Sequence, residues 1–165
     1  MRDAKNNSRK KKEIVVAVSG GFDPIHPGHI RLFREAKALG DKLVVILNND
    51  NWLRQKKKHV FMPQEERKEV LEALAGVDAV MLSGHLAATT DMSVCNELRR
   101  LRPDVFANGG DRVEDNVPEV AVCKEIGCRM VFNIGEGGKV QSSSWLLAQY
   151  VKAQTENRPP EARES

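Results

Sequence analysis

The stretch Ile14–His29, IVVAVSGGFDPIHPGH, decides the fold of this chain. It opens with an unbroken apolar run rich in β-branched residues and then reaches two adjacent glycines, Gly20 and Gly21. A short apolar run that ends in glycines is typical of a buried strand leading into a loop. Pro27 stands where a helix can begin, and residues 30–39 carry apolar side chains at helical spacing. The stretch therefore predicts a strand, a loop and a helix in succession.

The loop between this strand and this helix has the features of a phosphate site. In an open α/β sheet, ligands bind at the carboxyl ends of the strands, and a helix N-terminus there offers N–H groups and partial positive charge to an anion. Gly20 and Gly21 let a phosphate approach the backbone, and His26 and His29 add side-chain donors. Two other interpretations of the histidines stay open. They can form half of a zinc site, although no cluster of further ligands lies nearby, or they can bond loop carbonyls.

The same residues resemble the signature of the cytidylyltransferase-like superfamily of nucleotidyltransferases, which reads G-x-F-D-x-x-H-x-G-H. Gly20-Gly21-Phe22-Asp23 and His26-Pro27-Gly28-His29 match it at the predicted strand-to-helix turn. The resemblance implies that His26 and His29 are catalytic. They would hold the α-phosphate of a nucleoside triphosphate and stabilise the charge that develops as pyrophosphate leaves. The remaining residues of the signature are then expected to bind the nucleotide: Gly20, Gly21, Phe22, Asp23 and Gly28.

The composition indicates one globular domain. The chain has 165 residues, 41% of them hydrophobic, and no apolar run approaches the length of a membrane-spanning helix. Its cysteines, Cys95, Cys123 and Cys128, lack metal-ligand spacing, and no apolar leader precedes the first strand. We therefore expect reduced thiols, no membrane contact and a cytoplasmic location.

Charged segments flank the predicted domain, which spans residues 13–152. Residues 1–12 carry six basic side chains against one acid, although the net charge of the chain is only +3. Such a run can touch nucleic acid or an anionic membrane, but it is more often a solvated tail, and we expect a disordered tail. Residues 153–165, with two prolines and many charges, are expected to form a second tail.

Strand and helix patterns alternate along the domain. Short apolar runs predict four further strands, at Leu43–Leu47, Ala79–Leu82, Asp104–Ala107 and Arg129–Ile134. Helical spacing predicts helices at Pro63–Ala75, Thr89–Arg100, Pro118–Ile126 and Ser142–Val151. The alternation predicts an α/β fold with a doubly wound, five-stranded parallel sheet in a single Rossmann-like domain. A dinucleotide-binding domain is the competing prediction, but its G-x-G-x-x-G spacing is absent.

Two polar clusters follow the second predicted strand and would lie at the same sheet edge as the first loop. Asn48 and Asp50 come directly after the strand, and we expect them to bind substrate. A basic loop, Arg54–His59, follows; the resemblance places a functional lysine in it, for which we choose Lys57 as a catalytic residue. A merely solvated charged run is the alternative. Arg67, expected on the surface of the next helix, matches an arginine that many relatives turn toward the phosphates.

Two later segments complete the predicted nucleotide site. Gly110 and Asp111 follow the fourth strand and resemble the G-G-D of heptose-1-phosphate adenylyltransferases. Hydroxyl groups at the start of the last predicted helix can cap the backbone and also bind phosphate oxygens. These residues resemble the second signature of the family, although Gln141 replaces a common isoleucine: Ser142, Ser143 and Ser144.

The resemblance also implies the reaction. A phosphate monoester attacks the α-phosphate of a nucleoside triphosphate, and pyrophosphate leaves. Mg²⁺ would accompany the triphosphate, and no metal ligands are expected from the protein itself. Relatives of this kind are commonly homodimers, so we expect a homodimer.

The choice of substrates stays open between ATP and CTP. The residues after the second and fourth strands favour transfer of AMP from ATP to a sugar phosphate. A CTP-dependent glycerol-3-phosphate cytidylyltransferase is the alternative, and FAD synthetases and phosphopantetheine adenylyltransferases share the same core. From another class, a non-catalytic nucleotide-binding regulator whose basic tail contacts nucleic acid also stays open, although contact with nucleic acid is the less favoured prediction.

Overall fold

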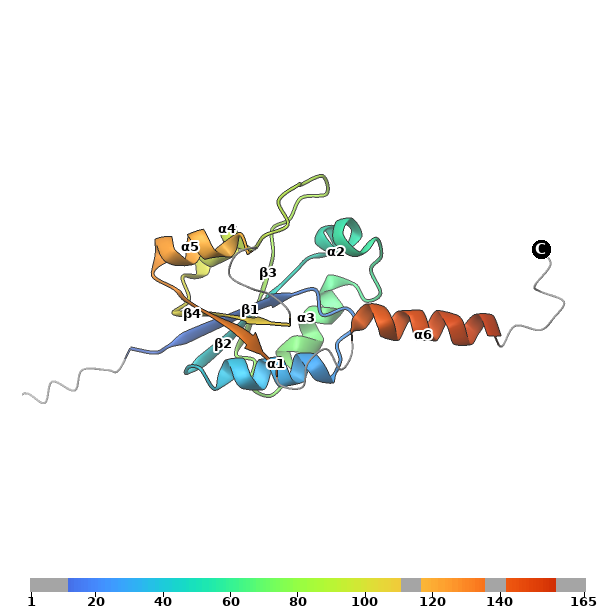
Figure 1. Ribbon diagram of the computed structural model, residues 1–165, viewed down its shortest axis with the longest axis horizontal. Coiled ribbons are helices and arrows are strands. Elements are labelled where there is room, and N and C mark those ends of the chain that lie inside the picture. Colours follow the sequence, from blue (N-terminus) through green and yellow to red (C-terminus); the bar gives the residue numbers. More distant parts are fainter. Residues whose placement is uncertain (1–11, 111–116, 136–141, 157–165) are drawn as a thin grey trace, which may run out of the picture.

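The predicted first strand lies at the centre of the sheet. The computed structural model describes residues 12–110, 117–135 and 142–156. In it, β1 (Val15–Gly20) pairs in parallel with β2 (Lys42–Leu47) on one side and with β4 (Val105–Gly109) on the other. β3 (Ala79–Leu82) and β5 (Arg129–Ile134) lie at the two edges. The strand order of this sheet is β3-β2-β1-β4-β5 (Figure 1).

Helices cover both faces of the sheet. α1 (Pro27–Lys37) and α3 (Gln64–Glu72) pack on one face, and α4 (Cys95–Leu101) and α5 (Glu119–Ile126) cover the other (Figure 1). Side chains of β1 alternate between the two faces: Val16 and Val18 join the core under α1 and α3, whereas Ala17 joins the core under α4 and α5. Because both faces of the sheet are buried, the sequences of the strands are nearly continuous apolar runs. The predicted doubly wound sheet in a single Rossmann-like domain is confirmed.

The strand order reverses between β1 and β4. From β1 the chain moves outward to β2 and β3, then crosses back to β4 and continues to β5. In open parallel sheets, ligands bind outside the carboxyl ends of the strands at this reversal. The loop after Gly20 and the end of β4 at Gly109 and Gly110 border it. The fold therefore brings these two predicted parts of the site to one edge.

The basic segment after β2 is not the loop that the sequence suggests. Its first part belongs to a helix, α2 (Asp50–Lys57). Asn49 is the N-cap, and its side chain accepts a hydrogen bond from the backbone N–H of Trp52 at 3.0 Å. An asparagine cap followed by an acidic residue in the first turn favours a helix start. The prediction of a loop was wrong because these polar residues were interpreted only as the end of a strand.

Two predicted helices are shorter than expected. The helix predicted from Thr89 begins at Cys95, because the Thr89 hydroxyl accepts a hydrogen bond from the Asp91 N–H and the Asp91 carboxylate accepts one from the Ser93 N–H. Such local side-chain bonds compete with helix formation. The helix predicted from Pro63 is also shorter than expected, since α3 covers only residues 64–72.

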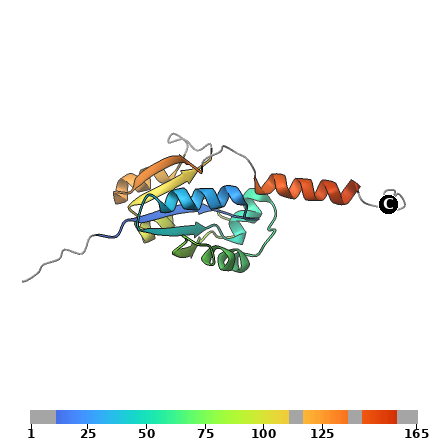
Figure 2. The ribbon, with the colours of Figure 1, turned by 90° about the horizontal axis from the view of Figure 1, so that it is seen from below.

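The last helix, α6 (Ser143–Glu156), projects away from the sheet and its covering helices (Figure 2). It continues past residue 152, so the predicted tail 153–165 begins too early. At the other end of the domain, Lys12 was predicted in a disordered tail, but it forms an ion pair with Asp104. Residues 1–11 and 157–165 of the predicted tails lie outside the described residues. No helix in the described ranges is both long and apolar enough to cross a bilayer.

Candidate functional site

The two predicted catalytic histidines cap the N-terminus of α1. The Nδ1 atom of His26 accepts a hydrogen bond from the backbone N–H of Gly28 at 3.1 Å. The Nδ1 atom of His29 accepts one from the backbone N–H of His26 at 3.3 Å. This is a capping box in which two imidazoles take the places usually held by a hydroxyl and a carboxylate. Each histidine therefore uses only one ring nitrogen, Nδ1, to stabilise the loop.

These hydrogen bonds assign the tautomer of each ring. A nitrogen that accepts a hydrogen bond carries no proton, so the proton of each neutral imidazole lies on Nε2. Burial lowers the pKa of His29 to about 3, with His26 and Lys57 acting in the same direction. Burial also lowers the pKa of His26, and the charge of Lys57 adds to this effect. Near neutral pH the helix start therefore carries two uncharged Nε2–H donors.

The position of both rings is fixed by aromatic packing. The rings of His26 and His29 are stacked, with their centroids 3.7 Å apart. Phe22 packs edge-on against His29 at 4.9 Å and against Phe33 at 5.1 Å. Phe22 itself is buried and has a φ of 49°, which is uncommon for a residue other than glycine. The phenylalanine of the signature thus supports the histidine pair from within the core.

The glycines of the loop are required by close packing. A Cβ atom on Gly20 would lie 2.8 Å from the ring of Phe22, and one on Gly21 would lie 2.8 Å from a methyl group of Leu53 on α2. A Cβ atom on Gly28 would lie 2.9 Å from the ring of His26. Any side chain at these positions would displace the groups that form the site.

Lys57 lies in the last turn of α2, close enough to the histidines for its charge to lower the pKa of both. Its neighbours Lys56 and Lys58 are exposed, whereas Lys57 is half-buried. Lys57, which was chosen from the three lysines on the sequence alone, is therefore the one whose charge acts on the two histidines. Its position on a helix, rather than on a loop, limits how far its backbone can move.

α2 is fastened to the loop between β3 and α4. Trp52 Nε1 donates to the carbonyl of Met92 at 2.9 Å, and Asn49 Nδ2 donates to the carbonyl of His85 at 2.8 Å. Gln55 Nε2 also donates to the carbonyl of Ala87 at 2.6 Å. These contacts join segments more than thirty residues apart, and no local sequence pattern indicates them. They hold the helix that carries Lys57.

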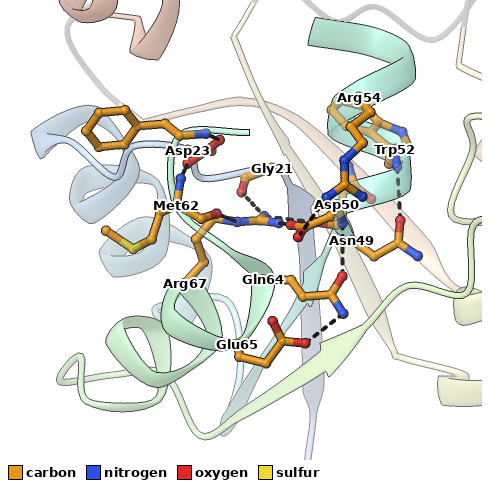
Figure 3. A network of polar contacts seen from close by, with 12 residues as sticks. Gly21, Asp23, Asn49, Asp50, Trp52, Arg54, Met62, Gln64, Glu65 and Arg67 are labelled. Carbon is orange, nitrogen blue, oxygen red and sulfur yellow. Dashed lines mark hydrogen bonds and ion pairs between the residues drawn. The ribbon is translucent and has the colours of Figure 1, made fainter. Parts of the chain in front are cut away.

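Asp23 positions the loop that leads into α3. Its buried carboxylate accepts hydrogen bonds from the backbone N–H groups of Phe61 at 2.7 Å and Met62 at 2.8 Å (Figure 3). Both carboxylate oxygens are therefore engaged within the protein. The sequence placed Asp23 in the nucleotide site, and the structure gives it a role in connecting the glycine loop to residues 61 and 62.

Arg67 is buried, so the expectation that it lies on the surface was wrong. Its guanidinium donates to three backbone carbonyls, and Nη2 donates to Asp50 Oδ1 at 2.7 Å (Figure 3). The carbonyls belong to Gly21 at 2.6 Å, Asn48 at 2.9 Å and Met62 at 2.9 Å. No sequence pattern indicates this cluster, because a charged residue in a charged helical turn usually faces solvent. Arg67 binds together the loop after β1, the end of β2 and the loop before α3.

The residues after β2 are largely engaged in structure. The Asp50 carboxylate faces Arg67, and the Asp50 N–H donates to Gln64 Oε1 at 2.9 Å. The backbone N–H of Asn48 donates to the carbonyl of Gly20 at 2.9 Å. The Asn48 side chain is buried, and its Oδ1 has no hydrogen-bond partner among the described residues. Asn48 therefore brings an unused acceptor next to the glycine loop, whereas Asp50 does not.

The serine segment lies beside the first loop. Ser143 Oγ donates to the carbonyl of Pro24 at 2.8 Å, and Ser142 Oγ accepts a hydrogen bond from the Trp145 N–H at 3.1 Å. Ser142 thus caps α6, as the sequence predicts, and Ser144 is exposed. After β4, Gly110 adopts a φ of 73°, and Asp111 lies outside the described residues.

The described residues contain no group of three or more His, Cys, Asp or Glu side chains arranged to hold a metal ion. The carboxylates of Asp23 and Asp50 are engaged by backbone N–H groups and by Arg67. A Mg²⁺ ion carried on triphosphate oxygens needs few protein ligands, because it keeps several of its waters. These residues suit a metal that arrives with a nucleotide.

Comparisons with known proteins agree with this geometry. The family model described as "Cytidylyltransferase-like" matches residues 17–136. The FAD synthase of Thermococcus kodakarensis is 42% identical over 104 residues, which cover 62% of this chain and 66% of that protein. The bifunctional protein HldE of Streptomyces coelicolor is 39% identical over 142 residues, which cover 85% of this chain and 29% of that protein. The chain thus spans less than two thirds of either relative.

A solved structure supports the same assignment. The lipopolysaccharide core biosynthesis protein of Thermoplasma volcanium superposes with a TM-score of 0.62 at 26% sequence identity. The match covers 76% of this chain and all of that protein. With the family model covering most of β1, the glycine loop, the histidine pair and the other four strands, the chain belongs to the cytidylyltransferase-like family of nucleotidyltransferases.

Proposed function

We propose that this chain transfers AMP from ATP to a phosphate monoester and releases pyrophosphate. The observation that carries the proposal is the pair of neutral imidazoles at the start of α1, each with its Nδ1 bonded to the backbone and its Nε2–H left as a donor. Two such donors, at a helix N-terminus and beside a lysine, match an anion that gains charge during the reaction. The family assignment supports nucleotidyl transfer as that reaction.

The residues of the site would act mainly by positioning and by electrostatic stabilisation. The Nε2–H groups of His26 and His29 would donate to oxygens of the α-phosphate, and the Lys57 ammonium would balance the charge that builds on the leaving pyrophosphate. Mg²⁺ bound to the triphosphate supplies further charge neutralisation. No side chain needs to act as nucleophile, because the phosphate of the acceptor attacks. One well-placed donor is worth roughly a hundred- to a thousandfold in rate.

The relatives favour ATP and suggest two acceptors. FAD is FMN joined to AMP through a pyrophosphate, so the FAD synthase relatives make FMN the first candidate. A sugar phosphate is the second candidate, supported by the match to HldE over 142 residues. Asp50 cannot separate the two, because its carboxylate is held by Arg67. Asn48 does not separate the two either, because its unpartnered Oδ1 is buried and both acceptors carry hydroxyls.

Pyrophosphate release tests the proposal. ATP and CTP, each with Mg²⁺, are crossed against FMN, heptose 1-phosphates, glycerol 3-phosphate and phosphopantetheine. We expect release with ATP and one acceptor, and its loss in a folded His29→Ala variant. Release with CTP and glycerol 3-phosphate would replace AMP transfer by CMP transfer, and normal turnover of His29→Ala would refute the role of the histidine.

A variant that lacks residues 1–11 separates the enzyme from the nucleic-acid-binding regulator. The deletion stops before Lys12, so it preserves the ion pair with Asp104. An enzyme keeps its turnover without these residues, whereas a regulator loses salt-dependent binding to nucleic acid. A homodimer and a cytoplasmic location stay predictions; size-exclusion chromatography with light scattering tests the first.

A further inference from the structure

Two cysteines meet at the end of α5, in a turn that the proposed function does not use. The backbone N–H groups of Gly127 and Cys128 both donate to the carbonyl of Cys123, the second at 2.8 Å. Gly127 has the left-handed φ of 73° that ends a helix in a Schellman motif. In this motif the side chains at the two ends of the turn contact each other, and here both of them are cysteines. Both belong to the same buried cluster between α5 and the sheet.

A cavity lies beside the pair. It has a volume of about 270 Å³ and is lined by residues of α5 and β5: Val120, Cys123, Lys124, Cys128, Met130 and Phe132. A water molecule occupies about 30 Å³ in the liquid, so the cavity admits one end of a small organic molecule. Because Cys128 directly precedes β5, the cavity lies at the amino edge of the parallel sheet, opposite the histidine pair.

The two thiols differ in acidity. The interaction between the two thiols lowers the pKa of Cys128 and raises the pKa of Cys123. The Cys128 thiol also donates to the carbonyl of Arg129 at 3.8 Å. Lys124 also lines the cavity. Cys128 is therefore the more readily ionised of the two, and its sulfur is the natural nucleophile. The third cysteine, Cys95, is half-buried on α4, and burial raises its pKa.

We propose that Cys123 and Cys128 form a redox modification site that reacts with small organic disulfides. The Cys128 thiolate attacks one sulfur of R–S–S–R; the S–S bond breaks, and RS⁻ leaves and takes up a proton. Cys123 then gives up its proton and attacks the Cys128 sulfur, which releases the second RS⁻. The protein loses two protons and two electrons and gains one intramolecular disulfide, while the reagent takes them up and is reduced to two molecules of RSH.

The native full-length chain and 2-hydroxyethyl disulfide test this site. After incubation, free thiols are blocked with N-ethylmaleimide, and the protein is digested with trypsin. Cleavage after Lys124 separates the two cysteines, so their disulfide appears in the mass spectrum as two linked peptides. We expect the linked peptides and the loss of two of the three maleimide labels, with Cys95 still labelled. In a Cys123→Ser variant we expect Cys128 to stop at the mixed disulfide with the reagent.

Three outcomes would overturn the proposal: full maleimide labelling of both cysteines, a wild-type protein in which Cys128 stops at the mixed disulfide, or preferential oxidation of Cys95. Each is read from the wild-type chain, so no conclusion depends on whether a variant folds. A Cys95→Ser variant is the matched control, and it should give the same linked peptides as the wild type.

Discussion

Replacing Arg67 with methionine should destabilise the domain strongly. The side chain is 1% exposed, and the change removes donors to three backbone carbonyls and the partner of the Asp50 carboxylate. Breaking a buried ion pair by removing one partner costs about 3–5 kcal/mol. Arg54 lies 3.8 Å from the other carboxylate oxygen of Asp50 and can compensate in part, so we expect about 3 kcal/mol.

Urea unfolding followed by circular dichroism measures this loss. With a slope of about 2 kcal/mol per molar urea, the midpoint should fall by roughly 1.5 M. Arg67→Lys keeps the charge but cannot reach three carbonyls and a carboxylate from one ammonium group, so its midpoint should fall between those of the wild type and Arg67→Met. Arg99→Met is the matched control, because Arg99 pairs with Glu125 at the exposed surface and should show no resolvable shift.

An unchanged midpoint for Arg67→Met would refute the structural role of the guanidinium. It would favour the expectation drawn from the family resemblance, in which this arginine turns toward the phosphates. A variant with wild-type stability but much weaker ATP binding would support that alternative directly.

Three further predictions concern the site. Lys57→Ala should lower kcat by roughly a hundred- to a thousandfold, whereas Lys58→Ala, at an exposed lysine, should leave kcat nearly unchanged. Equal effects of the two variants in steady-state kinetics would refute Lys57 as the catalytic lysine. The pKa of His29 is about 3 in the folded protein, against the ordinary histidine value of 6.5 in the unfolded chain. Between these values the unfolded chain binds the extra proton, so stability falls as pH falls, by about 1.4 kcal/mol per pH unit. Urea titrations from pH 6.5 to 4 should show this slope in the wild type and a smaller one in His29→Gln; equal slopes would contradict the buried neutral imidazole. Asp23→Ala should abolish slow hydrogen exchange at the Phe61 and Met62 amides, and retained protection there would show that the carboxylate does not hold the loop.

The sheet could be predicted from the sequence because its signals are local. Each buried strand is a short apolar run, and the loop after β1 carries its glycines, its proline and its histidines within ten residues. The strands Ala79–Leu82 and Arg129–Ile134 were predicted with the bounds that the structure has. Helix ends were less predictable, because local side-chain hydrogen bonds decide them, such as the Asn49 cap of α2 and the Asp91–Ser93 turn before α4.

The interior of the site could not be predicted in the same way. Arg67 is joined to Gly21, 46 residues away, and Asp23 is joined to Phe61, 38 residues away. Such contacts depend on how the loops fold over the sheet edge, and no spacing in the sequence encodes them. For the same reason, the sequence could not show that both carboxylates near the glycine loop serve the protein rather than the substrate.

Following the phosphorus atoms of ATP tests the central claim most directly. In a reaction with Mg²⁺ and the acceptor found by pyrophosphate release, ATP labelled with ³²P at the α-phosphate should pass its label to the acceptor product. ATP labelled at the γ-phosphate should place its label in pyrophosphate alone. Label from the γ-phosphate in the acceptor product would show phosphoryl transfer instead, and it would contradict attack at an α-phosphate held by His26 and His29.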